Sequence, residues 1–337
     1  MKTLIALLLA GLGNAALAAE PQPNLPPDEV VARILRANPM VNAASSQITV
    51  EEANRRRLEA GQYEWNVRLG GQQRKTTPNN ALDERFNEWN AALERPVRLP
   101  GKASLDAELG AAGVSLAETA HGDALHESSR SLLKAWFTWL KENAAAAQWT
   151  AQVALLEKQT QGVQRRQQLG DAAKLEAIQS EAALAQAEAQ RTQAQIRQRT
   201  AAEDLRRRFP GLPLSEPSSI AEPLPIVGSE AEWLATILQE SHELGIARGE
   251  SQFAQVTANR SRRDQLPDPT IGMHVSRERG GEENVVGAYI SIPLPGDGRR
   301  ATSDASLARA SAANYREAAA RQKIEAEAAT LYQSANA

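Results

Sequence analysis

The sequence predicts a mainly α-helical protein that also carries four amphipathic β-strands. Three observations lead to this fold class: one helical tract far longer than a globular domain holds, two pairs of segments with alternating polarity, and a strand-to-helix transition that occurs twice. Aromatic residues make up only 4% of the chain, and cysteine is absent. This composition favours long, antiparallel coiled-coil helices over a thick core or a disulfide-stapled scaffold.

The N-terminus has the layout of a secretory signal peptide. Lys2 precedes an apolar run from Leu4 to Leu12, which is too short to span a bilayer, and small residues follow up to Ala19. We expect residues 1–19 to be removed on export; a buried N-terminal helix is the alternative. After this segment no apolar run is long enough for a membrane helix. The net charge of −3, from 38 basic and 41 acidic residues that are well mixed, gives no reason to expect nucleic acid as a partner.

A first helix is expected from the Pro26-Pro27 pair to about Ala60, with one apolar stripe. The segments "EWNVRLGG" and "NEWNAALERPV" then alternate with a period of two, as do "PTIGMHVSRE" and "VVGAYISIP" later in the chain. Each reads as a strand with one apolar face and one polar face. The polar faces carry Asn66, Arg68, Asn90, Glu94, His274 and Ser276. Aromatic residues stand near strand ends, as in a membrane-interface girdle or an ordinary half-buried hairpin: Trp65, Phe86 and Trp89.

A helix of about 100 Å is predicted from Lys102 to Leu169, at about 1.5 Å per residue. Gly170 is a natural C-terminal cap, and Asp171 is a natural N-cap for a returning helix that ends near Phe209. The returning helix carries small or apolar residues at alternating steps of three and four, which predicts a coiled-coil seam. The seam residues are Leu175, Ile178, Ala182, Ala185, Ala189, Thr192 and Ile196.

The chain is a tandem duplication. "RPVRLPGKASLD" follows the second strand of the first copy, and "SIPLPGDGRRAT" follows the second strand of the second copy. We expect a first repeat at 20–211, a Pro/Ser-rich linker at 212–228 and a second repeat at 229–337. The second repeat lacks the tip and returning helix of the first, so we expect the gene or its record to be truncated.

These features together resemble the outer membrane factor (TolC-like) family of efflux channels. The similarity rests on the signal peptide, the duplicated unit, the two Leu-Pro-Gly transitions and "LGDAAKLEAIQSEAALAQAEAQ" at the helical turn. It covers essentially the whole mature chain. The form "LPGK" at Leu99–Lys102 is similar to the heavy-metal branch with CusC-like and CzcC-like proteins.

The resemblance implies a homotrimer in the outer membrane of a Gram-negative bacterium. Each protomer would give four strands to a twelve-stranded barrel, with polar faces in the lumen and apolar faces against outer membrane lipid, and its helices would form a periplasmic tunnel. The partners implied are a periplasmic adaptor (membrane fusion) protein and an inner-membrane pump, for example of the resistance-nodulation-division type. The adaptor-docking tip would include Arg165, Leu169, Gly170, Leu175 and Ser180.

The sequence therefore predicts a passive exit duct for drugs or metal ions, with no cofactor, no metal site and no catalytic residues. The four histidines lack metal-ligand spacing, and no phosphate loop, nucleophile elbow or pair of catalytic carboxylates is found. The alternatives are a soluble periplasmic coiled-coil scaffold and a truncated, non-functional remnant of such a channel.

Overall fold

The computed structural model describes residues 25–77, 83–215 and 226–336, so the predicted signal peptide lies outside the described residues. The chain forms two compact units. The first contains Met1–Arg36 and Ser131–Leu224, and the second contains Ala37–Arg130 and Pro225–Ala337. These units are defined by packing, and their limits differ from those of the sequence repeats, which stay a prediction.

The predicted first helix is interrupted in the structure. Helix α1 (Asp28–Arg36) ends before Asn38, and α2 (Pro39–Ala60) begins directly after it. The Asn38 side chain accepts a hydrogen bond from the backbone N–H of Met40 at 2.9 Å, and proline occupies the first helical position, where its missing N–H costs nothing. The expectation of one continuous helix to Ala60 was therefore wrong, although its end at Ala60 is confirmed.

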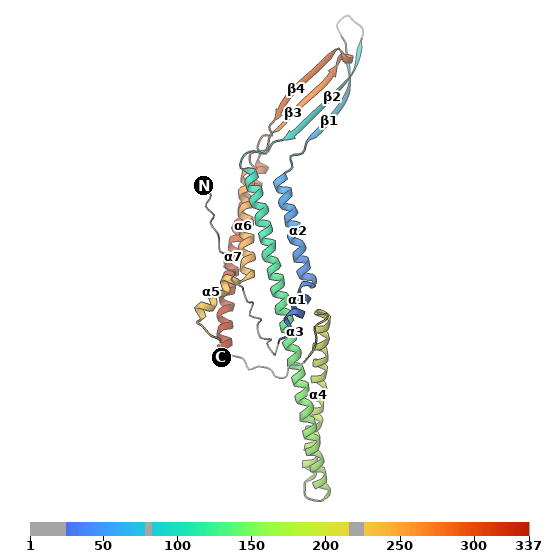
Figure 1. Ribbon diagram of the computed structural model, residues 1–337, viewed down its shortest axis with the longest axis vertical. Helices are drawn as coiled ribbons and strands as arrows, with labels where there is room; N and C mark the ends of the chain where they lie inside the picture. Colours follow the sequence, from blue (N-terminus) through green and yellow to red (C-terminus); the bar gives the residue numbers. More distant parts are fainter. Residues whose placement is uncertain (1–24, 78–82, 216–225, 337) are drawn as a thin grey trace, which may run out of the picture. The chain divides into compact units, whose positions relative to one another are not determined.

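Four antiparallel strands form one sheet in the order β1-β2-β3-β4 (Figure 1). They are β1 (Asn66–Thr76), β2 (Glu84–Pro96), β3 (Thr270–Glu278) and β4 (Glu283–Ser291). A single 3₁₀ turn (Arg279–Gly281) connects the last two strands. The two hairpins, separated by more than a hundred residues of helix, therefore join through the pairing of β2 with β3. All four predicted strands are confirmed.

The first unit is built around an antiparallel helical hairpin. Helix α3 (Lys102–Gln168) has 67 residues, and its C-terminal part packs against α4 (Lys174–Arg208). The buried positions of α4 include Ala177, Ala187, Ala194 and Leu205, which follow a heptad spacing. The predicted coiled coil is confirmed, but the predicted seam was wrong: it lies two residues away from the buried one, and its members, from Leu175 to Ile196, are exposed.

A hydrophobic cluster anchors the open end of this hairpin. Trp136 and Trp139 of α3 are buried and pack with Leu205 and Phe209 at the end of α4 and with Ile34 of α1. Both tryptophans therefore serve the packing between helices. Leu212 is also buried in the cluster, so the first residues of the predicted linker pack with the first unit.

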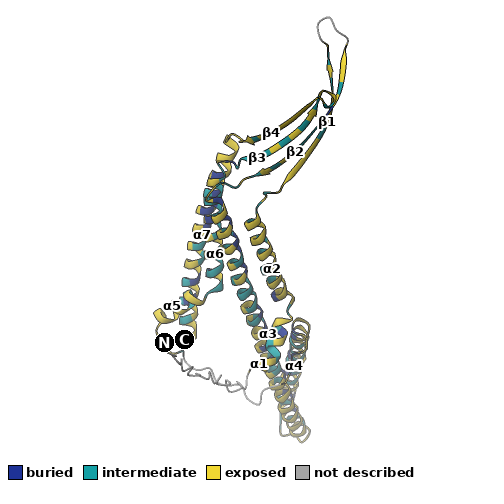
Figure 2. Ribbon diagram, turned by 45° about the horizontal axis from the view of Figure 1, so that its top comes forward, coloured by how far each residue is buried: buried dark blue, intermediate teal, exposed yellow. Residues whose placement is uncertain are grey.

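In the second unit, α5 (Glu230–Glu240), α6 (His242–Arg263) and α7 (Asp297–Asn336) pack together below the sheet (Figures 1 and 2). The side of α7 toward its neighbours is made of small residues, such as Ser303, Ala310 and Ala313, which permit close helix approach. Ser241 caps α6 as Asn38 caps α2. Residues 230–263 thus have the same order of short helix, cap and longer helix as residues 28–60.

Candidate functional site

The sheet has two chemically different faces. The cross-strand pairing places Val67, Leu93, Met273 and Ala288 in one row on one side. The adjacent row, on the opposite side, contains Asn66, Glu94, Gly272 and Tyr289. The register thus unites the apolar faces of both hairpins into one surface, and Figure 2 shows that most of the sheet is exposed in the single chain. The six polar residues singled out from the sequence all lie on the polar side: Asn66, Arg68, Asn90, Glu94, His274 and Ser276.

Ion pairs and hydrogen bonds cross the polar face from strand to strand. The Arg68 guanidinium lies 2.6 Å from a carboxylate oxygen of Glu94, and the Tyr289 hydroxyl donates to the other oxygen at 2.6 Å. This chain of contacts spans β1, β2 and β4, because Gly272 of β3 leaves room for the tyrosine ring between them. The polar face is therefore a connected network rather than a set of separate solvated groups.

A second polar cluster surrounds Glu88 near the hairpin ends. This carboxylate is only 5% exposed; it pairs with Arg74 at 3.0 Å and accepts hydrogen bonds from Gln72 at 2.7 Å and from the backbone N–H of Arg279 at 3.1 Å. Arg74 also contacts Glu278 of β3 at 2.8 Å. A buried carboxylate with this many donors fixes the hairpins to each other. The cluster needs residues of both hairpins, so the sequence of one hairpin does not predict it.

The three predicted interface aromatics do not share one face. Trp89 pairs with Gly71 on the apolar side and is 51% exposed, and Trp65, just before β1, is 58% exposed and lies under the Arg95 guanidinium. Phe86 pairs with Arg74, so its side chain belongs to the polar face. Phe86 is out of phase with Trp89 in a period of two, so the two side chains belong to opposite faces, and the role of the three aromatics at a membrane interface stays a prediction.

The strands join the helices through a buried charge network around Lys102. This lysine, the last residue of the Leu-Pro-Gly-Lys motif, is 2% exposed. Its ammonium group lies 2.9 Å from Asp268 and 3.1 Å from Asp264, and it donates to the backbone carbonyl of Leu266 at 2.7 Å. The start of α3, in the first repeat, is thereby fixed to the loop between α6 and β3, in the second.

Asp268 is the centre of this junction. Its carboxylate accepts hydrogen bonds from the Tyr63 hydroxyl at 2.8 Å and from the backbone N–H of Leu99 at 3.0 Å. Burial alone would raise the pKa of Asp268, but these hydrogen bonds and the nearby ammonium of Lys102 lower it below its ordinary value. Burial and the contact with Asp268 raise the pKa of Tyr63 to about 12. At neutral pH the network therefore holds an ionised Asp268 and a protonated Tyr63.

A second buried carboxylate, Asp106, extends the network along α3. It is 5% exposed and pairs with Arg260 at 2.5 Å and with Arg98 at 3.4 Å. Arg98 also donates to the carbonyls of Leu58 and Glu59 at the end of α2. Burial would lower the pKa of the Arg260 guanidinium, but its acidic partners raise it. The connections between α2 and β1, between β2 and α3 and between α6 and β3 thus meet in one set of paired charges, and α7 reaches it through Arg299, which donates to the backbone carbonyl of Asp264 at 3.0 Å.

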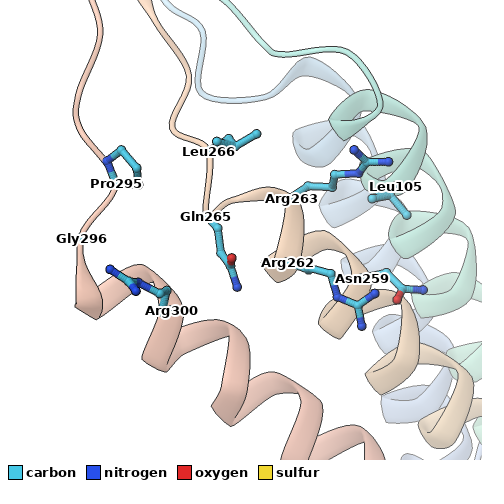
Figure 3. Close-up of a pocket in the computed structure, with 9 residues that line it drawn as sticks. All are labelled: Leu105, Asn259, Arg262, Arg263, Gln265, Leu266, Pro295, Gly296 and Arg300. Atoms are coloured by element: carbon cyan, nitrogen blue, oxygen red, sulfur yellow. The ribbon is translucent and has the colours of Figure 1, made fainter.

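A basic groove lies beside this junction (Figure 3). It encloses about 650 Å³ between the first turns of α3 and α7 and the last turn of α6, and three arginines line it, namely Arg262, Arg263 and Arg300. All three side chains are exposed, and Arg300 pairs with Asp297 at 3.0 Å. The groove is an open, positively charged surface rather than an enclosed ligand cavity.

The predicted docking residues cluster at the closed end of the α3–α4 hairpin. Gly170 has a φ of +80°, and the N–H groups of Gly170 and Asp171 donate to the carbonyls of Gln167 and Arg166, which is a Schellman cap. Arg165 and Leu169 are exposed, Leu169 to 78%. The expectation for Asp171 was wrong: Ala173 precedes α4 without a side-chain cap, and Asp171 pairs with Arg166 at 3.2 Å.

Leu175 and Ser180 occupy the first turns of α4. Leu175 is 64% exposed, so an apolar surface forms with Leu169 at the tip. Ser180 is partly buried; its hydroxyl donates to the carbonyl of Ala177, and its own carbonyl accepts from Thr160 of α3. Ser180 therefore contributes to packing of the hairpin, whereas both leucines and Arg165 are free to meet a partner.

In residues 25–77, 83–215 and 226–336, no helix combines the length and the apolar character needed to cross a membrane. Within the same ranges, no group of three or more histidine, aspartate or glutamate side chains is arranged to hold a metal ion.

Comparison with solved structures identifies the fold. The chain is similar to a membrane protein from Pseudomonas aeruginosa (TM-score 0.71, 14% identity, 88% of this chain and 71% of that one). It is also similar to the CmeC outer membrane channel of Campylobacter jejuni (TM-score 0.67, 13% identity, 90% and 71%) and to CusC, described in terms of transmembrane channel formation (TM-score 0.64, 14% identity, 90% and 72%). No protein-family model matches the sequence, and no curated protein is similar to it.

The chain therefore has the fold of the outer membrane factor (TolC-like) channels, as the duplicated motifs predicted. CusC is among the similar structures, and its 14% identity equals that of the membrane protein from Pseudomonas aeruginosa. The residues that sequence reasoning missed are those of the junction. A charged residue directly after Leu-Pro-Gly and the two aspartates of "RRDQLPDP" were visible signals, but nothing in either segment shows that they meet.

Proposed function

We propose that this protein is the outer membrane channel of a tripartite efflux system, a passive exit duct that works as a homotrimer. The observation that carries the proposal is the four-stranded sheet, in which one face is apolar across the rows through Val67 and Leu69, the other face is polar, and both outer edges are unpaired among the described residues. The outer membrane factor fold of the chain supports it. The helices would lie in the periplasm.

The free edges of β1 and β4 are the physical reason for a ring. Backbone N–H and C=O groups without partners cost several kcal/mol each in hydrocarbon, so only a closed barrel is stable there. Four strands are too few to enclose a channel, whereas three copies contribute twelve. The apolar rows would then face lipid, and the polar residues, such as Arg68 and Glu94, would line the lumen. The opposite orientation would place Arg68 in lipid, at roughly 2–4 kcal/mol near the midplane.

The energy for export would come from an inner-membrane pump, for example of the resistance-nodulation-division type, coupled through a periplasmic adaptor. We assign adaptor docking to the tip of the α3–α4 hairpin, with Arg165, Leu169 and Leu175 as the contact residues and Gly170 and Ser180 shaping the turn. The support is the exposure of two leucines beside a rigidly capped turn. The transported compounds would be drugs or metal ions, selected by lumen polarity and width rather than by tight binding.

Two neighbouring residues of β2 offer a matched test. Ala91→Arg places a cation on the apolar face, and Asn90→Arg places the same cation on the polar face one residue away. Both variants and the unchanged chain are expressed in a Gram-negative strain that lacks its own outer membrane channel. We then measure heat-modifiable trimers in the outer membrane fraction and growth on drugs and on metal salts.

We expect Asn90→Arg to assemble as the unchanged protein does and Ala91→Arg to be depleted from the outer membrane, because each trimer would expose three arginines to lipid. Recovery of the unchanged protein in the soluble periplasm would instead support a coiled-coil scaffold. Equal assembly of the two variants would contradict the assignment of faces.

A further inference from the structure

We propose that β4 of one copy pairs with β1 of the next in a defined register, with Ser291 opposite Arg68, Tyr289 opposite Gly70 and Glu283 opposite Thr76 of the neighbour. This inference rests on the barrel proposed above and adds what that proposal leaves open, the residue partners at the seam between copies. The three internal registers of the sheet, read with the sequence repeat, supply it.

The first argument is the stagger between the two hairpins. Asn66 begins β1 as Thr270 begins β3, and the apolar residues that follow each are in phase. A row of cross-strand partners that starts at Asn66 passes through Glu94 and reaches Gly272, which lies two positions beyond Thr270. From β1 to β3, the row of cross-strand partners is therefore shifted by two residues along the strand. If the next hairpin, in the neighbouring copy, follows the same step, the row through Thr270 and Ser291 arrives at Arg68 of that copy.

The second argument is barrel closure. A step of two residues for each hairpin, with two hairpins in each of three copies, gives a total stagger of about 12 residues over twelve strands. With a rise of about 3.3 Å per residue and strands about 4.8 Å apart, the strands would tilt by about 35°. This value lies in the range of roughly 35–45° found for membrane barrels. A seam shifted two residues the other way, with Gly287 opposite Gly70, would give only about 19°.

The third argument is the pairing of glycine with large side chains on the polar face. The ring of Tyr289 lies over Gly272, where an added Cβ would stand 2.5 Å from it, and His274 lies over Gly287 in the same way. The proposed register places Gly70 beside the other flank of Tyr289 and avoids a pair of facing glycines. A shift in the opposite sense would instead carry the first residues of β4 past Thr76, where β1 ends.

The register also connects the polar network around the ring. Within one chain, Arg68 contacts Glu94 diagonally across β1 and β2, and Glu94 accepts from Tyr289. With Ser291 opposite Arg68 of the neighbour, that arginine stands diagonal to Tyr289, within reach of a long side chain. Arg68, Glu94 and Tyr289 would repeat three times as one belt of alternating charge and hydroxyl around the lumen.

Disulfide formation between copies tests the register, and the absence of cysteine from the chain removes any background. Leu69→Cys is combined in turn with Ile290→Cys, Ala288→Cys or Ile292→Cys, all on the apolar face and exposed in the single chain. The three double variants and the four single variants are oxidised in outer membranes and run on non-reducing gels. A disulfide needs Cβ atoms about 3.8 Å apart, which a diagonal neighbour does not offer.

We expect covalent dimers and trimers from Leu69→Cys with Ile290→Cys, several-fold above the other two pairs. A second series, Gly71→Cys with Ala288→Cys against Gly71→Cys with Val286→Cys or Ile290→Cys, repeats the comparison at the same register should one variant assemble poorly. Strongest cross-linking to the other partners would overturn the register and leave the barrel intact. Heat-modifiable trimers without any cross-link would overturn the pairing of β4 with β1, and loss of outer membrane trimers from the unchanged chain would overturn the proposed function itself.

Discussion

Replacing Lys102 by methionine removes a buried ammonium group from contact with three oxygen atoms. Lys102 neutralises Asp268 at 2.9 Å and Asp264 at 3.1 Å, and it satisfies the Leu266 carbonyl at 2.7 Å. Methionine has similar length and fills the same space, so the substitution isolates the charge from the packing. We expect the junction between β2 and α3 to lose stability while the fold of the helices is retained.

The loss of stability depends on which hydrogen bonds and ion pairs Asp264 and Asp268 retain without Lys102. Removing one member of a buried ion pair costs about 3–5 kcal/mol, because the remaining charge stays desolvated. Asp268 retains hydrogen bonds from Tyr63 and the Leu99 N–H, and Asp264 retains its ion pair with Arg260. The lower end, about 3 kcal/mol, is therefore expected. At 1.4 kcal/mol for each factor of ten, this corresponds to roughly a hundredfold increase in local opening.

Hydrogen exchange of the detergent-solubilised protein measures this opening at the first turns of α3. The matched control is Lys323→Met, which removes an equally close ion pair, with Glu243 at 2.8 Å, from an exposed position on α7. Exposed pairs contribute little, so we expect exchange near α7 to stay almost unchanged. The reasoning fails if the Lys102 variant exchanges at the start of α3 no faster than the control does.

Two further predictions concern the same unit. Because the folded-state pKa of Asp268 is lowered, its contribution to stability is complete at neutral pH and is lost as the pH falls below about 4. The free energies of unfolding of the unchanged protein and of Asp268→Asn, measured in urea between pH 7 and pH 3, should therefore converge at low pH. A difference that stays constant with pH would contradict this. Gly272→Ala should lower the free energy of unfolding in urea by about 1–3 kcal/mol, because its Cβ would stand 2.5 Å from the Tyr289 ring. Gly71→Ala, with 3.8 Å to its nearest contact, should leave this free energy unchanged, and equal values for the two variants would show that the ring adapts freely.

Local patterns in the sequence were sufficient for the elements of the fold. Strict alternation in both hairpins predicted the strands, and the pairing of β2 with β3 places their polar sides on one face. Gly170 predicted the end of α3. The break between α1 and α2 was also visible, because Asn38 followed by Pro39 is a helix-start signal. The apolar stripe that continues past these residues obscured it, which shows that a capping signal can outweigh periodicity.

The position of the coiled-coil seam was harder to predict, for a physical reason. Helix α4 is so rich in alanine that two stripes offset by two residues both follow a heptad spacing. Hydrophobicity ranks the stripe with Leu175 and Ile178 first, yet α3 contacts the stripe with Ala177 and Ala187. Close approach of two helices favours the smaller side chains, so the larger ones stay on the outer side of the hairpin.

The junction was not predictable from local patterns, because its partners lie far apart in the chain and act only when the two repeats meet. Lys102 follows β2 and Asp268 precedes β3, and each alone resembles an ordinary surface charge. Their burial follows from the pairing of β2 with β3, which brings both strand-to-helix connections to one edge of the sheet. The ion pair between Lys102 and Asp268 depends on a long-range contact, which sequence periodicity does not predict.

The two Leu-Pro-Gly segments also show why, in the proposed ring, contacts between hairpins within a chain cannot be equivalent to those between chains. Lys102 follows the Leu-Pro-Gly segment after β2, but Asp297 follows the Leu-Pro-Gly segment after β4, and the Asp297 side chain is 96% exposed and paired with Arg300. The start of α7 therefore has no buried counterpart of the Lys102 ammonium, and it contacts the junction through Arg299, which donates to the backbone carbonyl of Asp264 at 3.0 Å. Within a chain, the two hairpins are joined by the network around Lys102 and Asp268; between chains, the proposed ring would join hairpins through the edges of β4 and β1. The six hairpins of the proposed ring would thus be related by threefold but not by sixfold symmetry, because the contacts within a chain differ from those between chains. We expect each chain to form its own junction first and to assemble through its strand edges afterwards.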